Sequence, residues 1–182
     1  MGRPKAELRV GGQPILGYLI DRFRWEGPTL LVTAPGREGP RGSDRFTREV
    51  IDPVAGEGPL RGVLTAMEAT ETDLLLIATC DMPLLEAGQL AWLAEELSRR
   101  SQARLVMTTH DGQLEPLPLA IRSSAIAWLR EHYTRGGRSI QSLAAADGSV
   151  VLGAPDDWPG KWRTNLNTPA DLAAFLDQPD VP

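Results

Sequence analysis

A run of apolar residues that leads directly into a carboxylate and a proline constrains the fold of this chain most. The run begins Leu74-Leu75-Leu76-Ile77-Ala78 and continues as Thr79-Cys80-Asp81-Met82-Pro83. A continuous apolar run that ends at a breaker is typical of a strand buried on both faces, as in parallel sheets with helices on either side. In open α/β sheets, ligands bind outside the carboxyl ends of the strands. The pattern therefore predicts an α/β fold with Asp81 at the binding edge.

A carboxylate at the tip of a buried strand needs a partner, because an unpaired buried charge is costly. Mg²⁺ fits well, since proteins usually hold it with one or two carboxylates plus substrate phosphates. Position alone is equally compatible with Asp81 capping the following helix or pairing with a nearby arginine. The magnesium and structural interpretations therefore remain open at this point.

Size and composition indicate one globular domain spanning residues 1–182. Hydrophobic residues make up 42% of the chain and charged residues 24%, which argues against disorder. A net charge of -5 argues against a nucleic-acid partner, and a single Cys excludes an internal disulfide. The sequence has no apolar run long enough to span a membrane and no signal-peptide core. We therefore expect no membrane association and a cytoplasmic location.

Apolar spacing and turn residues divide the chain into alternating helices and strands. Helices are predicted at residues 14–23, 60–67, 90–97, 125–132, 139–146 and 169–176. Further strands are predicted at residues 6–10, 29–33, 49–51, 104–109, 117–121 and 150–152. Pro116 and Pro118 place the strand at 117–121 at an edge or a bend. His110, in a predicted hairpin turn, is interpreted as structural or exposed rather than catalytic.

Three loops carry residues suited to binding. The glycine-rich residues 54–62 enter a helix whose N-terminus can receive phosphate on free N–H groups, although a flexible connection that needs glycine for positive φ is at least as common. Residues 135–138 place two arginines around a glycine pair, suited to an anion or simply solvated. Asn165 and Asn167 alternate around Leu166, which indicates a binding edge. Thr168 is the predicted N-cap of the last helix.

Four motifs together resemble the molybdenum cofactor guanylyltransferases, which are Rossmann-like nucleotidyltransferases. They are Gly2-Arg3-Pro4-Lys5, Gly58-Pro59-Leu60-Arg61-Gly62, Cys80-Asp81-Met82-Pro83 and Asn165-Leu166-Asn167-Thr168-Pro169. Their order and spacing match that family over nearly the whole chain. The resemblance implies a mostly parallel sheet with helices on both faces, and transfer of GMP from GTP to molybdopterin with Mg²⁺ and release of pyrophosphate. It also implies contacts with proteins of molybdenum-cofactor biosynthesis and with molybdoenzymes.

The resemblance also implies roles for individual residues. Lys5 would neutralise GTP phosphates and Asp81 would hold Mg²⁺, which makes these two the candidate catalytic residues. Asp52 would contact the nucleoside. The implied nucleotide-binding residues are Gly2, Lys5, Asp52, Gly58, Pro59, Gly62 and Asp81, and the implied pterin-binding residues are Arg138, Asn165 and Asn167. The two asparagines would face the pterin side or help hold the metal. The attacking phosphate is already anionic, so the reaction needs charge neutralisation and in-line positioning rather than a Ser or His nucleophile.

The sequence departs from that family in two places. Family members begin with an apolar strand and a Leu-Ala-Gly-Gly type loop ahead of the Met-Gly at which this sequence starts. Loss of this central strand would leave two unpaired ladder edges inside the sheet, so we expect either a misplaced gene start or a truncated, inactive relative. We expect weak or no turnover for the chain as given. The other departure is Ala34-Pro35-Gly36, where the family often has an Asn that contacts nucleotide.

Two alternative functions remain at this stage. One is a nucleotidyltransferase of the same fold that uses CTP or a sugar phosphate. The other is a noncatalytic relative that binds the pterin or a protein partner. Nucleotide competition distinguishes the first alternative from a guanylyltransferase. A guanylyl-transfer assay distinguishes the noncatalytic relative from an enzyme.

Overall fold

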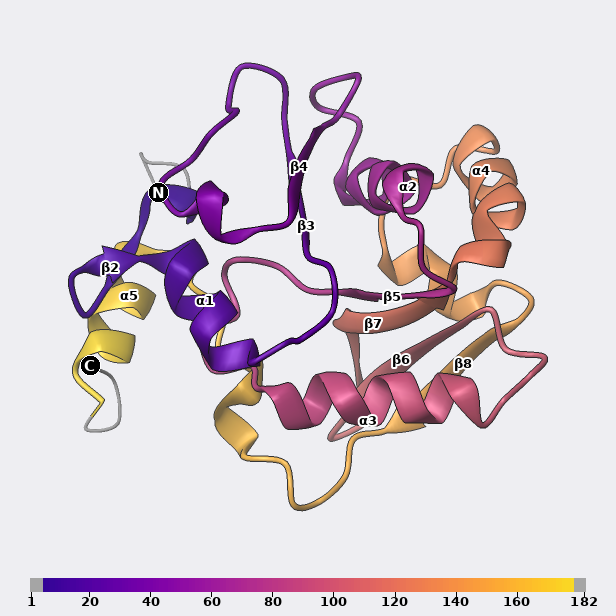
Figure 1. The fold of residues 1–182 in the computed structure, drawn as a ribbon. Helices are drawn as coiled ribbons and strands as arrows, with labels where there is room; N and C mark the ends of the chain where they lie inside the picture. Colours follow the sequence, from indigo (N-terminus) through magenta and orange to yellow (C-terminus); the bar gives the residue numbers. More distant parts are fainter. Residues whose placement is uncertain (1–4, 179–182) are drawn as a thin grey trace.

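The computed structural model describes residues 5–178, which form a four-stranded main sheet and two smaller two-stranded sheets (Figure 1). The main sheet has the order β5-β7-β6-β8, formed by β5 (Leu74–Ile77), β7 (Gln113–Arg122), β6 (Leu105–His110) and β8 (Ser149–Gly153). The smaller sheets pair β3 (Leu30–Thr33) with β4 (Arg48–Ile51), and β1 (Arg9–Val10) with β2 (Gln13–Pro14). The α-helices are α1 (Ile15–Phe23), α2 (Pro59–Ala69), α3 (Ala87–Ser98), α4 (Ile126–Thr134) and α5 (Pro169–Leu176).

Helices cover both faces of the main sheet. On β6, Leu105 and Met107 belong to the core cluster formed with α2 and α4, whereas Val106 between them packs with Leu93 and Leu97 of α3. This alternation follows from the two-residue period of a strand. Figure 1 shows α2 and α4 above the sheet and α3 below it. The predicted α/β class with helices on both faces is confirmed.

The strand pairs of the three sheets are mixed rather than mostly parallel. β3–β4 and β6–β8 are parallel, but β5–β7 and β6–β7 are antiparallel. The turn at Asp111 and Gly112, both with positive φ, joins β6 to β7 as a hairpin and so forces the antiparallel direction. β5 then pairs with the reversed strand.

β7 is central, so its expected place at a sheet edge is wrong. Its prolines are tolerated because the β6 ladder shifts register between Val106 and Thr108, which leaves residues 116–118 of β7 without ladder partners. The missing N–H groups of Pro116 and Pro118 therefore break no ladder bond. The expected bend is present as this register shift.

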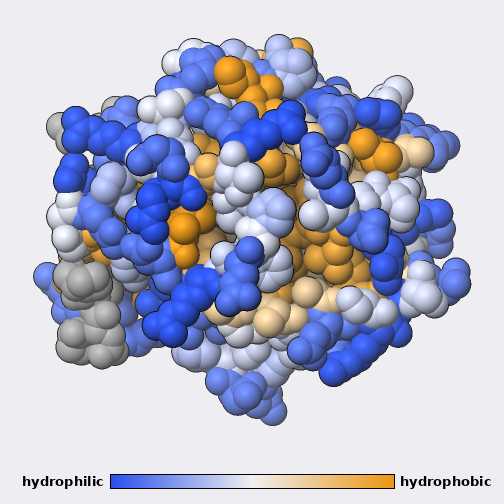
Figure 2. Space-filling model, viewed as in Figure 1, coloured by the Kyte–Doolittle hydropathy of each residue, from blue (hydrophilic) through white to orange (hydrophobic). Residues whose placement is uncertain are grey.

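Strand β5 is less buried than its sequence suggests. Only Leu75 is buried, whereas Leu74, Leu76 and Ile77 are partly exposed, so the expected burial on both faces is wrong. Within residues 5–178, β5 bonds only to β7, and β3 bonds only to β4. One ladder edge of each strand therefore lacks a strand partner in this part of the chain. Apolar surface is visible at the centre of the face shown in Figure 2.

The two ends of the described chain pack together, and this packing builds the site. Val10, Ile15 and Leu16 from the N-terminal region share a core cluster with Leu166 and Phe175 near the C-terminus. Figure 1 shows α5 close to α1 and β2. The short 3-10 helix Lys5–Glu7 leads into this cluster. Lys5 is thereby brought to the Asn165–Asn167 segment although it lies far from it in sequence.

Two predicted elements differ in type. Residues 139–146, expected as an α-helix, contain only the 3-10 helix Gln141–Ala145, because Ser139 and Ser142 bond to each other through side chain and backbone and compete with α-helical bonding. Residues 6–10, expected as a strand, contain part of the first 3-10 helix and the two-residue β1. The remaining 3-10 helices are Ser43–Arg45, Ser123–Ala125 and Gly160–Arg163. Between residues 5 and 178, no helix has the length and apolar content of a membrane span.

Candidate active site

The centre of the candidate site is the carboxylate of Asp81, which lies just beyond the end of β5. Lys5 Nζ donates to Asp81 Oδ2 at 2.5 Å and to Asn167 Oδ1 at 2.7 Å. The hydroxyl of Thr79 donates to the other carboxylate oxygen, Oδ1. The Asp81 side chain is 17% exposed and that of Lys5 is 34% exposed, so the pair is reachable from solvent. Lys5, Asp81 and Asn167, which were predicted from separate motifs, therefore lie in contact with one another.

The segment Asn165–Asn167 is fixed to Asp81 by its backbone. Leu166 is fully buried, and its N–H donates to the carbonyl oxygen of Asp81 at 2.9 Å. Asn165 and Asn167 on either side are exposed, which confirms the predicted alternation. The Asn165 side chain donates to the Arg163 carbonyl at 3.0 Å, whereas Asn167 reaches Lys5. Within residues 5–178, Asn167 therefore contacts the Lys5–Asp81 pair through its side chain, whereas the Asn165 side chain bonds to Arg163.

A capping box at the start of α5 holds Asn167 in place. Asp171 Oδ2 accepts from the N–H of Asn167 at 2.9 Å and from the N–H of Thr168 at 2.7 Å. The Thr168 hydroxyl accepts from the N–H of Asp171 at 3.1 Å, as predicted for this N-cap. Hydrogen bonds from the Thr168 backbone and side chain lower the pKa of Asp171. The carboxylate therefore stays ionised while it anchors the segment.

Cys80, beside the central carboxylate, is held as a neutral thiol. Burial raises the pKa of Cys80 to about 11, and the negative charge of Asp81 acts in the same direction. The Lys5 ammonium opposes this shift but does not overcome it. A thiol with so high a pKa is a poor nucleophile at neutral pH. Cys80 therefore serves to pack the strand end and not to carry out chemistry.

Asp52 lies in a second group of site residues, after β4. Its carboxylate accepts a hydrogen bond from the Thr65 hydroxyl on α2, and Arg61 in turn donates to the same hydroxyl at 3.1 Å. Gly62 lies close by, since a Cβ built on it would be 3.8 Å from Asp52 Oδ2. Helix α2 and the carboxylate after β4 are therefore in direct contact.

The N-terminus of α2 does not offer free N–H groups of the expected kind. Pro59 has no N–H, the Leu60 N–H donates to the carbonyl oxygen of Arg138 at 3.2 Å, and the Arg61 N–H donates to the carbonyl oxygen of Gly58 at 3.1 Å. Phosphate binding through these amides is therefore an expectation that the structure contradicts. Gly58 has a φ of 83°, which agrees with the alternative that the loop needs glycine for its backbone conformation.

Arg138 belongs to this second group and not to the Asp81 centre. Its Nε lies 3.2 Å from Glu57 Oε2, and its guanidinium lies over the ring of Tyr133, 4.2 Å from the centroid. Sequence reasoning missed Glu57 and Tyr133, because no local pattern indicates a contact between residues 76 positions apart. Sequence reasoning also missed Thr79. Its position two residues before Asp81 could have indicated that its hydroxyl bonds to the Asp81 carboxylate. Gly2 lies outside the described residues.

The oxygen atoms around Lys5 fit a divalent cation such as Mg²⁺. Among residues 5–178 there is no cluster of three or more His, Cys, Asp or Glu side chains that could enclose a metal. An ion held here would therefore depend on Asp81, with Asn167 Oδ1 beside it, plus waters and substrate phosphates, which is the usual arrangement for Mg²⁺. The Lys5 ammonium already bridges these two oxygens, so they accept positive charge.

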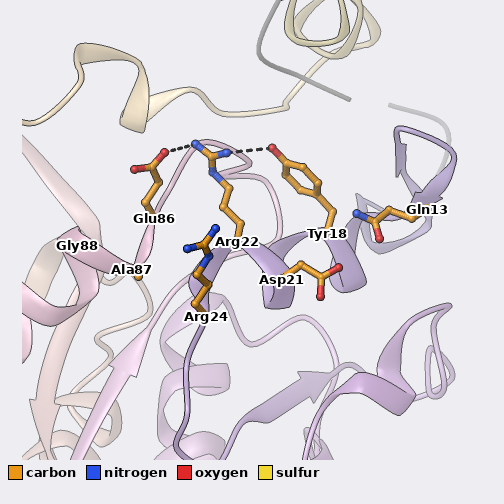
Figure 3. Close-up of a pocket in the computed structure, with 8 residues that line it drawn as sticks. All are labelled: Gln13, Tyr18, Asp21, Arg22, Arg24, Glu86, Ala87 and Gly88. Atoms are coloured by element: carbon orange, nitrogen blue, oxygen red, sulfur yellow. Dashed lines mark hydrogen bonds and ion pairs between the residues drawn. The ribbon is translucent and has the colours of Figure 1, made fainter.

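A hollow between α1 and α3 is separate from these two groups (Figure 3). Arg22 crosses it, bonding to Glu86 and lying 3.5 Å from the Tyr18 hydroxyl. None of the predicted site residues lines it. Its lining residues are Gln13, Tyr18, Asp21, Arg22, Arg24, Glu86, Ala87 and Gly88.

Comparison with solved structures identifies the fold. The chain aligns with molybdopterin-guanine dinucleotide biosynthesis protein A from Archaeoglobus fulgidus with a TM-score of 0.77 and 21% identity, covering 95% of this chain and 89% of that one. It aligns with 2-C-methyl-D-erythritol 4-phosphate cytidylyltransferase from Thermus thermophilus with a TM-score of 0.68 and 18% identity, covering 95% and 92%. The chain therefore shares its fold with these two proteins.

Sequence comparison then gives the family. The MobA-like NTP transferase domain matches residues 1–150. The chain is 32% identical over 169 residues to the molybdenum cofactor guanylyltransferase of Pseudomonas fluorescens (strain SBW25), covering 92% of this chain and 82% of that protein. It is 29% identical over 182 residues to the one from Cereibacter sphaeroides, covering 94% and 86%. The chain belongs to the molybdenum cofactor guanylyltransferase family, enzymes of nucleotidyl transfer in molybdenum-cofactor biosynthesis.

Proposed function

We propose that this chain transfers GMP from GTP to the phosphate of molybdopterin. An oxygen of the pterin phosphate attacks the α-phosphorus of GTP, a new P–O–P bond forms, and the bond to the β-phosphate breaks to release pyrophosphate. Charge accumulates on the phosphates as this happens, so neutralisation and alignment are the main catalytic needs. The observation that carries the proposal is the contact of Lys5 with both Asp81 and Asn167.

In this proposal the Lys5 ammonium turns from Asp81 to the triphosphate when the nucleotide binds. Asp81, with Asn167 beside it, would hold Mg²⁺, and a bound ion would supply neutralisation of phosphate charge. The Asp81 carboxylate would keep a cation beside it, and the Lys5 ammonium would gain an anionic partner in the triphosphate. Thr79 and the backbone bond from Leu166 keep the Asp81 carboxylate and main chain oriented throughout.

The second group of residues would bind the rest of the two substrates. Asp52 would contact the nucleoside, and the Gly58, Pro59 and Gly62 surface would receive the nucleotide by close backbone approach. Arg138 from this group, together with Asn165 from the segment fixed to Asp81, would meet the pterin side. Support for a shared nucleotide surface comes from the hydrogen bond that joins Asp52 to α2 and from the contact of Gly58 with the Arg138 loop.

A transfer assay with radiolabelled nucleotide tests the function. The chain is incubated with molybdopterin, Mg²⁺ and α-labelled GTP or CTP, and labelled dinucleotide and pyrophosphate are measured. We expect product from GTP and not from CTP, formed at the weak rate that the sequence leads us to expect. Product from CTP alone would overturn the guanine assignment and favour a cytidylyltransferase, and pterin binding without transfer from either nucleotide would favour a noncatalytic relative.

The two lysines of the chain provide a matched pair of variants. Lys5→Met should lower the transfer rate by about two orders of magnitude, because it removes a donor that meets developing phosphate charge. Lys161→Met changes an exposed lysine in the Gly160–Arg163 turn and should leave the rate unchanged. Equal rates for the two variants would contradict the role given to Lys5.

A further inference from the structure

Two loops that are far apart in sequence meet at the start of α2. The loop before α2 contains Glu57 and Gly58, and the loop after α4 contains Arg138. The Leu60 N–H donates to the Arg138 carbonyl oxygen at 3.2 Å, and a Cβ on Gly58 would lie only 2.9 Å from the same oxygen. The proposed nucleotide surface and the proposed pterin-side arginine are therefore in direct backbone contact.

The side chain of Tyr133, near the end of α4, ties the two loops together. Its hydroxyl donates to Glu57 Oε2 at 2.7 Å, and its ring lies under the guanidinium of Arg138. Arg138 Nε lies 3.2 Å from the same Glu57 oxygen, so Tyr133, Glu57 and Arg138 all contact one another. Arg61 of α2 lies over the ring as well, 5.7 Å from its centroid. The hydrogen bond to Glu57 raises the pKa of Tyr133, so the phenol remains a donor at neutral pH.

We propose that Tyr133 is a positioning residue that holds the Gly58 loop and the Arg138 loop in one fixed arrangement for nucleotide binding. This inference rests on the proposed function. Tyr133 acts through Glu57 and Arg138 and does not itself take part in the chemistry. A loop that is ordered before the ligand arrives loses less entropy on binding, so the effect belongs mainly to nucleotide affinity and not to the chemical step.

The Tyr133→Phe variant tests the role of the hydroxyl. It removes one oxygen atom and keeps the ring face that Arg138 contacts. We expect the Leu60 amide to exchange hydrogen about fivefold faster, because the loop contact opens more often. The KM for GTP should rise about five- to tenfold, the size expected for losing a partly exposed hydrogen bond to a charged group, while kcat stays within about twofold.

Tyr18→Phe is the matched control. It removes the same atom from the other tyrosine of the chain, on α1 in the hollow of Figure 3, where the hydroxyl lies 3.5 Å from Arg22. We expect neither Leu60 exchange nor the KM for GTP to change in this variant. A general loss of stability from removing a tyrosine hydroxyl would appear in both variants, whereas loop positioning appears only in Tyr133→Phe.

Glu57→Gln separates the hydroxyl contact from the charge contact. The amide oxygen still accepts from Tyr133, but the ion pair with Arg138 is lost.

A double substitution tests whether Tyr133 acts through Glu57. If it does, combining Tyr133→Phe with Glu57→Ala should raise the KM for GTP no further than Glu57→Ala alone. Additive effects of the two substitutions would overturn the proposal.

The exchange measurement also keeps the two proposals distinguishable. Unchanged Leu60 exchange in Tyr133→Phe overturns the inference, and so does faster exchange with an unchanged KM for GTP. Absence of guanylyl transfer by the unsubstituted chain overturns the proposed function, and with it the role in nucleotide binding. The coupling of the loops would still be decided by exchange, which needs no substrate.

Discussion

Gly58→Ala should damage both the stability of the fold and the binding of nucleotide. Gly58 has φ 83° and ψ 169°, a region that essentially only glycine adopts, so a side chain there costs about 1–3 kcal/mol in backbone strain. The new Cβ would also meet the Arg138 carbonyl oxygen at 2.9 Å and the Arg138 Cβ at 3.4 Å. The loops must separate to relieve this contact.

Separation of the loops weakens the hydrogen bond from Leu60 to Arg138, which contributes about 0.5–1.5 kcal/mol. The summed cost is about 2–4 kcal/mol, and for a chain of this size it corresponds to a fall in Tm of roughly 5–15 °C. Thermal unfolding followed by circular dichroism measures the stability loss. Titration calorimetry with GTP and Mg²⁺ measures the binding loss, which we expect to be at least about tenfold.

Gly56→Ala is the control that separates strain from contact. Gly56 also has a positive φ, 81°, but no atom lies within 4 Å of a Cβ built on it. This variant should therefore show the backbone strain without the steric contact, and GTP affinity should change little. If Gly58→Ala and Gly56→Ala matched in both Tm and GTP affinity, the argument that the Arg138 loop supports the nucleotide surface would be refuted.

Two further predictions follow from protonation at the site. Cys80 should react with iodoacetamide far more slowly than free cysteine at pH 8, because burial raises the pKa of its thiol to about 11; a rate equal to that of free cysteine would contradict this. The stabilisation from Asp171 should be fully present above the ordinary carboxyl pKa of 3.8 and be lost only as the pH falls through its lowered value in the folded state. The amide NMR signals of Asn167 and Thr168 should report this, and a midpoint at or above 3.8 would count against the capping box as their anchor.

Local patterns in the sequence predicted what local physics decides. The Leu74–Ile77 strand, the helices that cover the sheet, the alternation around Leu166 and the Thr168 capping box follow from side-chain period and cap chemistry, and all are present. The contact between Lys5 and Asp81, in contrast, does not follow from a local sequence pattern. It depends on packing between the two ends of the described chain and was expected only through resemblance to a family.

The failures have tertiary causes. Pro118 suggested an edge, but the register shift in β6 lets a proline-containing strand lie in the centre. The free N–H groups expected at the start of α2 are occupied, and the Leu60 N–H is bonded to Arg138 from a distant part of the chain. The Tyr133 contact with Glu57 likewise joins distant segments, and nothing in either local sequence indicates it. Contacts between distant segments depend on how the helices pack on the sheet. The spacing of residues along the chain does not determine that packing.

The most direct test of the account is the magnesium dependence of GTP binding in Asp81→Asn. The substitution keeps the size of the side chain and removes the charge that is proposed to hold the ion. We predict that Mg²⁺ strengthens GTP binding to the unsubstituted protein, measured by calorimetry at fixed ionic strength, and that Asp81→Asn removes this dependence while Tm stays close to the original. An equal Mg²⁺ dependence in the two proteins would contradict the claim that the carboxylate beyond β5 is where metal and nucleotide meet.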